Sequence, residues 1–283
     1  MDRRQGNFEK AIQEFNEAMT RDPRNSTPIA ALADTLVSTR QFYASEQAYD
    51  RAIHVSPDQP LLRVKKAYDV TSRKTGDNTD VCSAIASLPA SIADDRSASF
   101  FRLFLALNDR DWLQAKELLE KINGGEDDGE FAYGQIPVPV DCYTILITRL
   151  QEEQFEGNSK FVEVRQDLSQ RAQRSPAKAN LVSQLAVVDA LLNNKAKAIS
   201  EAKRAVEMLP VSRDAIDGPG MLINLAVVYA WTDEPDLAFA TLAPLTNTPG
   251  GIYYGQLKAD SYWEPLRKDP RFDKLLAELA PKD

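Results

Sequence analysis

Apolar residues recur along this chain at the spacing of amphipathic helices, and prolines separate the apolar stripes. Residues 7–19 carry the first stripe, and Asp22-Pro23 ends it because a residue that precedes proline avoids the helical region. Three further stripes cover residues 28–38, 42–53 and 61–70. Short helices joined by short connections are typical of antiparallel helical hairpins.

Later segments repeat this pairing of helices. The paired stripes cover residues 97–107 with 112–122, 141–153 with 161–173, 180–192 with 196–208, and 222–229 with 238–242. No segment shows the sustained alternation of a β-strand, and Pro137 and Pro139 argue against a central strand at residues 136–140. The pattern predicts an all-α protein of about seven helical hairpins, some of them degenerate.

The first two hairpins follow a strict period of 34 residues. The positions that repeat are Phe8, Phe15, Ala18 and Pro23, which recur as Phe42, Tyr49, Ala52 and Pro57. A fixed period of this length indicates an array of stacked repeats. The alanine-to-proline spacing returns at residues 198–210, whereas residues 83–89 are degenerate and inserts at 123–140 and 213–220 break the period.

These residues resemble the tetratricopeptide repeat, a helix–turn–helix unit of the same length. Residues 225–229 (Leu-Ala-x-x-Tyr) are similar to the core of its first helix, and residues 11–18 (Ala-x-x-x-Phe-x-x-Ala) are similar to its second helix. Small residues are expected where paired helices press together, at Ala33, Ala67, Ala186 and Ala226. The resemblance implies a right-handed α-solenoid of stacked antiparallel helical hairpins, a tetratricopeptide-like superhelix, with a C-terminal helical cap.

The last part of the chain suggests a narrower resemblance. Residues 257–272 read Leu-Lys-Ala-Asp-Ser-Tyr-Trp-Glu-Pro-Leu-Arg-Lys-Asp-Pro-Arg-Phe, and they resemble the tetratricopeptide tail of many bacterial multidomain signalling proteins. Such proteins carry a serine/threonine kinase, an adenylate cyclase or a winged-helix DNA-binding domain upstream. The resemblance covers residues 95–280 and implies an interaction or sensory module rather than a catalyst.

We expect one continuous solenoid in four parts. They are N-terminal hairpins at residues 1–123, a loop at 124–139, C-terminal hairpins at 140–247 and a cap at 248–283. Residues 3–8 resemble the turn inside a repeat whose first helix is missing. Because terminal repeats normally carry a polar outer face, we expect the chain to be a fragment, or residues 7–20 to pack on another domain or subunit.

The charge balance bears on partners and location. The net charge is −8, from 34 basic and 42 acidic residues, which argues against nucleic acid as a direct partner. The sequence lacks an apolar run that could span a bilayer and a signal-peptide pattern, which favours the cytoplasm; an extracytoplasmic position after a missing transmembrane segment is the alternative. Cys82 and Cys142 are expected to be buried apolar residues rather than a disulfide or zinc site.

The sequence contains no convincing set of catalytic residues, and it predicts no enzyme, cofactor or metal site. His54 is the single histidine, near the end of a predicted helix, where it suits the helix dipole better than catalysis. The acidic stretch at residues 124–130 lacks the ligand spacing of a calcium loop. We interpret Tyr262-Trp263 as an aromatic plug over the last hairpin rather than a ligand cage.

The concave face of a stacked array, formed largely by the first helix of each pair, is the expected binding surface. The residues predicted to lie on it are Asp34, Ser38, Tyr68, Phe100, Phe104, Gln184, Asn224 and Trp231. The Lys/Asn clamp with which some members of this superfamily hold a peptide terminus is absent. An acidic, partly aromatic groove suits a basic or apolar helix, or an extended segment, of a protein partner.

These observations predict a non-enzymatic protein–protein interaction or regulatory scaffold module of a bacterial signalling protein. The alternative is a sensor that binds a small peptide or metabolite and regulates an attached kinase, cyclase or DNA-binding domain. An enzyme built on the helical array ranks third. A groove open to solvent favours a protein partner, and a closed pocket with convergent polar groups favours a small ligand.

Overall fold

The structure is a computed structural model that describes residues 2–93, 95–123, 140–151 and 159–281. Within these ranges the chain forms helices, turns and loops without a β-strand, which confirms the all-α prediction. No helix of the described segments combines the length and the apolarity that crossing a bilayer requires. The predicted loop at 124–139, with its acidic stretch, lies outside the described residues.

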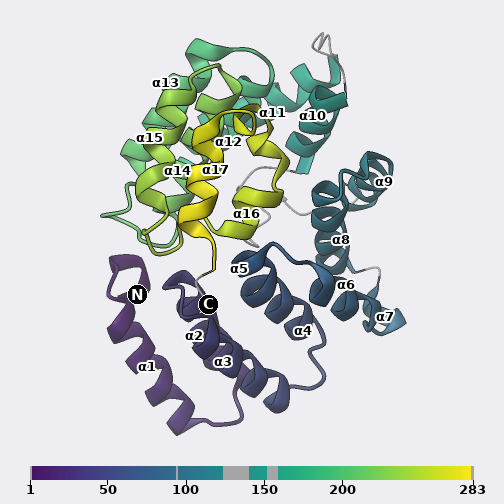
Figure 1. Cartoon of the computed structure of the whole chain (residues 1–283), viewed down its shortest axis with the longest axis vertical. Helices are drawn as coiled ribbons and strands as arrows, with labels where there is room; N and C mark the ends of the chain where they lie inside the picture. Colours follow the sequence, from purple (N-terminus) through teal and green to yellow (C-terminus); the bar gives the residue numbers. More distant parts are fainter. Residues whose placement is uncertain (1, 94, 124–139, 152–158, 282–283) are drawn as a thin grey trace.

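The N-terminal half consists of short helices that run up and down (Figure 1). They are η1 (Asp2–Gln5), α1 (Phe8–Arg21), α2 (Ser26–Ser38), α3 (Phe42–Val55), α4 (Leu61–Lys66), η2 (Ala67–Ser72), α5 (Arg73–Thr75), α6 (Thr79–Ala86), α7 (Ala90–Ala93), α8 (Arg96–Asn108) and α9 (Trp112–Asn123). α4, η2 and α5 form one continuous helix with a π-helical stretch in its middle. The hairpins predicted from the apolar stripes are present as α2–α3 and α8–α9.

The C-terminal half stacks further hairpins and ends in a cap. Its helices are α10 (Val140–Gln151), α11 (Ser159–Arg174), α12 (Ala179–Leu191), α13 (Lys195–Met208), α14 (Gly218–Trp231), α15 (Pro235–Leu245), α16 (Tyr254–Ala259), η3 (Ser261–Leu266) and α17 (Pro270–Leu279). The hairpins α12–α13 and α14–α15 pack on each other through α12, α13 and α14. In the cap, η3 packs on α14 and α17 packs on α15.

One turn geometry recurs within four hairpins. Each turn places a non-glycine residue in the left-handed region, two residues after the first helix ends, at Arg40, Arg110, Asn193 and Asp233. The residue that follows donates its backbone N–H to a carbonyl five residues back, as Gln41 does to Leu36 at 2.8 Å. This bond belongs to the Schellman motif, which satisfies the carbonyls at a helix C-terminus. Its recurrence shows that the four hairpins are built alike.

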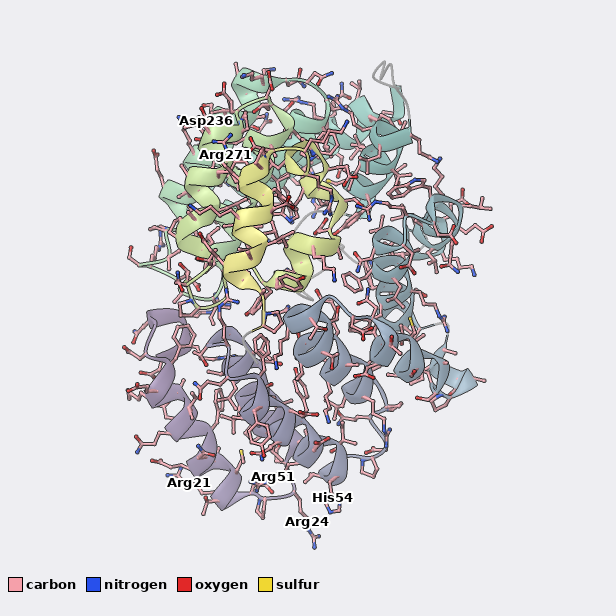
Figure 2. All side chains as sticks on the ribbon, viewed as in Figure 1. Arg21, Arg24, Arg51, His54, Asp236 and Arg271 are labelled. Carbon is pink, nitrogen blue, oxygen red and sulfur yellow. The ribbon has the colours of Figure 1, made fainter. Side chains whose placement is uncertain are left out.

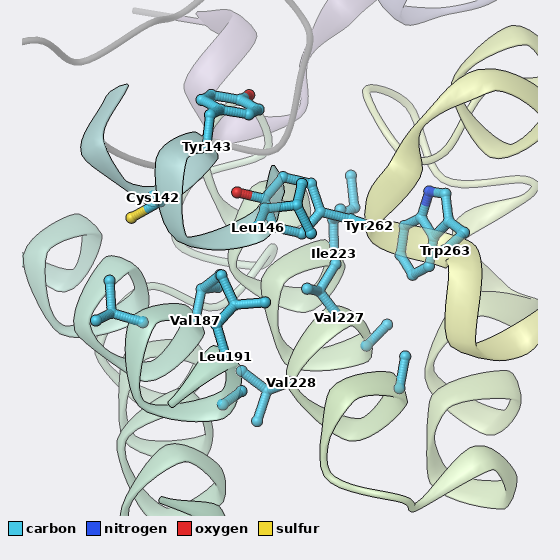
Figure 3. Close-up of a cluster of buried hydrophobic side chains, with 14 of the residues drawn as sticks. Cys142, Tyr143, Leu146, Val187, Leu191, Ile223, Val227, Val228, Tyr262 and Trp263 are labelled. Carbon is cyan, nitrogen blue, oxygen red and sulfur yellow. The ribbon is translucent and has the colours of Figure 1, made fainter. Parts of the chain in front are cut away.

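The main core joins α10, α12, α14 and the cap (Figure 3). Leu146, Val187 and Val227 come from three different helices and are buried. Tyr262 and Trp263 of η3 are both 0% exposed in this core, which confirms their interpretation as a plug. The cap is therefore part of the folding unit rather than an appendage.

The two cysteines differ in their surroundings. Cys142 is buried in the main core, as predicted, but Cys82 is exposed on α6, so that prediction is wrong. Val81 and Ile85 are the buried positions of α6, four residues apart on one face. Cys82 follows Val81 by one position, which on a helix turns its side chain about 100° away from the buried face.

Charged side chains mark both ends of the molecule (Figure 2). At the outer end of the N-terminal hairpins lie four exposed basic side chains, Arg21, Arg24, Arg51 and His54. His54 occupies the last turn of α3, as the sequence predicted.

In the cap, Arg271 of α17 pairs with Asp236 of α15 at 2.6 Å, which ties the last helix to the last hairpin.

The N-terminus of the chain lies against the turn that precedes α14. The backbone N–H of Ala215 donates to the carbonyl of Arg4 at 2.8 Å. The guanidinium of Arg4 pairs with Asp214 and, at 2.6 Å, with Asp217. Residues 4 and 214–217 therefore hold the two halves of the chain together at this edge (Figure 1).

A second contact, which we call the closure, joins residues 37–40 and 72–76 to residues 245–258. The backbone N–H of Gly250 donates to the carbonyl of Ser38 at 2.9 Å, and the Tyr253 hydroxyl donates to the carbonyl of Val37 at 3.3 Å. The helix α16 packs directly on α5. The closure brings the C-terminal cap onto the N-terminal hairpins, so the array is closed on itself rather than extended.

The first helix keeps a partly exposed apolar face. α1 packs on α2, but Phe8, Ile12 and Phe15 stay only half-buried. The 3₁₀ helix η1 before it is covered by the turn at residues 214–217 of the same chain. Packing of residues 7–20 on another domain or subunit stays a prediction.

A buried ionic cluster ties α11, α12 and α13 together. Arg165 forms two bonds to the carboxylate of Asp189, at 2.6 and 2.9 Å, and Asn194 donates to the same carboxylate at 2.6 Å. Asp189 is 0% exposed. Burial, and then the nearby Asp189 carboxylate, raises the pKa of Glu201 to about 7 from 4.5. Ionisation of Glu201 therefore destabilises the folded state.

Glu201→Gln is expected to stabilise the protein at pH 8 and to change little at pH 4. A raised folded-state pKa means that the folded state binds the proton more tightly, so stability falls as pH rises from about 4.5 to about 7. After allowance for partial exposure, the gain at pH 8 is about 1–2 kcal/mol. Thermal melting at both pH values measures it, with exposed Glu207→Gln on α13 as control. An equal shift at the two pH values would contradict this account.

Candidate functional site

Five of the eight residues predicted on a concave binding face are buried. Tyr68 is 1% exposed and packs edge-on against Phe104 with ring centroids 4.8 Å apart. Phe100 and Phe104 are each 7% exposed. Gln184 and Asn224 are buried between helices, where the Asn224 amide donates to the Ser183 hydroxyl at 2.8 Å. These side chains pack between helices, and the expectation that they face an open groove is corrected.

The other three are half-buried and bonded within the chain. Asp34 accepts hydrogen bonds from the Tyr49 hydroxyl at 2.7 Å and from Lys65 Nζ at 2.6 Å. The carbonyl of Ser38 takes part in the closure. The Trp231 indole N–H donates to the carbonyl of Tyr262 at 2.8 Å. These three residues form hydrogen bonds with other residues of the same chain. A role for them in partner binding stays a prediction.

The closure forms a cavity of about 630 Å³, which we call the closure cavity. Four parts of the chain line it: the start of α3 with the turn before it, α5, the segment after α15 together with the first residue of α16, and the end of α17 with the residues after it. The lining residues are Arg40, Gln41, Phe42, Tyr43, Ala44, Arg73, Lys74, Thr246, Asn247, Tyr254, Glu278, Leu279, Ala280 and Pro281. The cavity therefore exists only while the cap is docked on the N-terminal hairpins.

Arg40 is fixed in the wall of the cavity. It is the left-handed residue of the α2–α3 turn, with φ of 60°. One terminal nitrogen donates to the carbonyl of Ile252 at 2.7 Å, and its guanidinium lies 4.8 Å from the ring centroid of Tyr253. Burial lowers the pKa of Arg40, although the group stays charged at any physiological pH. No carboxylate of the described residues lies within ion-pair distance of it.

Arg73 lies on the other side of the same tyrosine. Its guanidinium is 4.9 Å from the ring centroid of Tyr253 and 5.2 Å from that of Tyr68. Its Nε pairs with Asp69 at 3.2 Å, and the other oxygen of Asp69 lies 2.7 Å from the Tyr49 hydroxyl oxygen. Burial alone would lower the pKa of Arg73, but the Asp69 carboxylate together with Tyr68 and Tyr253 more than offsets this, so the pKa is raised.

The mouth of the cavity is polar and carries one exposed aromatic ring. Tyr43 is 75% exposed, although it is the second residue of α3. Lys74, Asn247 and Glu278 are exposed beside it. Phe42, half-buried, packs edge-on against Tyr253 with ring centroids 6.3 Å apart. An exposed aromatic ring next to a recess is a common anchor for a binding partner.

The lining of this cavity combines charged, aromatic and amide side chains. Its lining offers three cationic side chains and one carboxylate, together with aromatic rings and amides. In the described segments, no three His, Cys, Asp or Glu side chains are placed to hold a metal ion. The arrangement can hold an anionic or aromatic group in a partly enclosed space.

The comparisons with known proteins are sparse. No protein-family model matches the chain, and no curated protein matches it. One solved structure that is similar is described as "Crystal structure of YrrB: a TPR protein with an unusual peptide-binding site". The similarity covers 94% of this chain and 98% of that one, at 12% identity and a TM-score of 0.27. Values this low do not establish a common fold.

Proposed function

We propose that this chain is a non-enzymatic protein-interaction module that binds a peptide segment of its partner at the closure cavity. The observation that carries the proposal is the cavity itself, with Tyr43 exposed at its mouth and cationic groups in its wall. Its volume lies within the range of known ligand pockets. Part of an extended segment fits in such a space while the rest of the segment lies across the rim.

The scaffold supports this function physically. Stacked hairpins fix the α2–α3 turn, and the closure fixes the cap against it, so the lining residues are held before a ligand arrives. Preorganised groups lose less conformational entropy on binding. The bacterial signalling setting belongs to this proposal and rests on the resemblance of residues 257–272. The cytoplasmic location also belongs to it and rests on the expectation from the sequence pattern, which lacks a bilayer-spanning apolar run and a signal peptide.

The sensor alternative gains support from the same cavity. A recess with convergent polar groups suits a small peptide or metabolite as well as a longer segment. Because the cavity forms between the cap and the N-terminal hairpins, a bound ligand would stabilise the closed arrangement of the two. A sensor could transmit this ligand-dependent stabilisation of the closed arrangement to an attached domain.

Peptide selection with Tyr43→Ala tests the proposed function. The full chain is immobilised and used to select binders from a random heptapeptide library. We expect enriched peptides whose affinity falls about tenfold or more when Tyr43, the exposed aromatic residue at the mouth, is truncated. Leu113→Ala is the matched control, because Leu113 is 73% exposed on α9 outside the cavity. If nothing is enriched, or if the enriched peptides ignore Tyr43→Ala, the function assigned to this cavity is wrong.

A further inference from the structure

The charge of the closure cavity is opposite to that of the chain. The whole chain carries a net charge of −8, yet the cavity lining holds Arg40, Arg73 and Lys74 against the single carboxylate of Glu278. Among the described residues, only Arg73 of these three cations has a carboxylate within ion-pair distance. Grouped cations without ion partners repel one another unless an anion is near.

Only some of the N–H donors of the Arg40 guanidinium form hydrogen bonds to described residues. Its hydrogen bonds to described residues leave from one terminal nitrogen, to the carbonyls of Ile252 at 2.7 Å and Leu245 at 3.5 Å. The remaining N–H groups of the guanidinium have no acceptor among the described residues. The contact with the Tyr253 ring holds the group in place. A planar guanidinium with free donors matches the two oxygens of a carboxylate.

Lys74 extends the positive surface outward. It follows Arg73 directly, is exposed, and has no carboxylate of the described segments within ion-pair distance. Tyr43 and Tyr254 line the same cavity and give apolar surface beside the charges. Cations and aromatic rings together suit a segment that carries both acidic and apolar side chains.

We propose that the partner segment is acidic, and that one of its Asp or Glu carboxylates binds the free donors of Arg40 while Lys74 attracts a second carboxylate at the rim. This inference rests on the proposed function, whose site it shares. It replaces the basic or apolar partner that the sequence analysis expected for an acidic groove, because the local charge at the site determines which ligand is attracted.

The composition of the selected peptides is the first test. Peptides that bind the full chain should be enriched in Asp and Glu, next to an aromatic or aliphatic residue. A selected peptide is then resynthesised with Gln and Asn in place of its Glu and Asp residues, and both versions are titrated by calorimetry. We expect the amide version to bind about tenfold more weakly or worse, because it cannot form charge-assisted hydrogen bonds.

Variants of the two cations supply the second test. Lys74→Glu should weaken the acidic peptide about tenfold or more, and Arg40→Gln should do the same. Lys203→Glu is the control, since Lys203 is exposed on α13 and makes the same charge change away from the cavity. Arg40→Gln also removes a bond across the closure, so Lys74→Glu decides the matter if Arg40→Gln does not fold.

The outcomes separate this inference from the proposed function. Peptides that lack Asp and Glu, or that bind equally well after conversion to amides, overturn the acidic ligand but leave peptide binding in place. Equal affinity of Lys74→Glu and Lys203→Glu also overturns it. Absence of any enriched peptide removes both.

Discussion

Gly255→Ala is expected to lower the stability of the protein by about 3 kcal/mol and to separate the cap from the N-terminal hairpins. A Cβ atom at position 255 would lie 1.9 Å from the carbonyl oxygen of Ser72 and 3.0 Å from the backbone nitrogen of Gly76. Both neighbours are backbone atoms, so no side chain can move aside. The helix α16 would have to leave α5, and the closure cavity would lose one wall.

The direction of the stability change in Gly255→Ala distinguishes the effect of helix propensity from that of the contact between α16 and α5. Gly255 lies in α16, where alanine has the better helix propensity by about 1 kcal/mol, so local propensity alone predicts stabilisation. Chemical denaturation of Gly255→Ala and of Ser200→Ala, an exposed small-residue control on α13, measures the difference. A midpoint equal to or above that of the natural sequence would mean that α16 does not press on α5.

Ala226→Arg is expected to cost about 4 kcal/mol or more, enough to unfold much of the protein at 37 °C. Ala226 is 0% exposed in α14, at the middle of the main core. An arginine there would both overpack the contact between helices and bury a charge without a partner. Ala33 and Ala186 are also 0% exposed, as the sequence predicted for small residues between paired helices.

Circular dichroism melting of Ala226→Arg and Ala196→Arg checks this prediction. Ala196 is exposed near the start of α13, so the same substitution should be tolerated there. Melting temperatures that agree between the two variants would show that α14 does not lie in the core as described.

Local features of the fold follow well from the sequence. The apolar stripes at residues 28–38 and 42–53 predict the hairpin α2–α3, because burial of one helix face requires a partner helix. Asp22-Pro23 ends the first helix at Arg21, as the steric rule for residues before proline requires. Such signals depend on near neighbours along the chain, so a single sequence contains them.

The site could not be found in the same way. Arg40 and Ile252 are 212 positions apart, and no periodic pattern indicates that their segments meet. A stripe shows which face of a helix is buried, but not which hairpin covers it. The prediction of an open concave face therefore assigned Tyr68 and Phe104 to a groove, whereas both pack in the interior. A period of 34 residues suggests an extended array and gives no sign of closure.

One feature of the sequence does indicate the segment beside the closure cavity. Tyr253 and Tyr254 come shortly after Gly250-Gly251, near the start of the predicted cap. Binding residues lie disproportionately often in connecting segments. Here Tyr253 is 3% exposed and carries Arg40 and Arg73 on its ring. The two arginines come from the N-terminal half of the chain and Tyr253 from the C-terminal half, so the sequence pattern does not show that they meet.

The array closes on itself, and this closure forms the proposed binding site. Spin labels at Tyr43 and Asn247, which line the closure cavity from opposite halves of the chain, test it by electron–electron distance measurement in a Cys82→Ser background. For a closed array we expect one narrow distribution of short distances, which broadens and shifts to longer distances in Gly255→Ala. A broad, long distribution in the natural sequence, unchanged by Gly255→Ala, would contradict it.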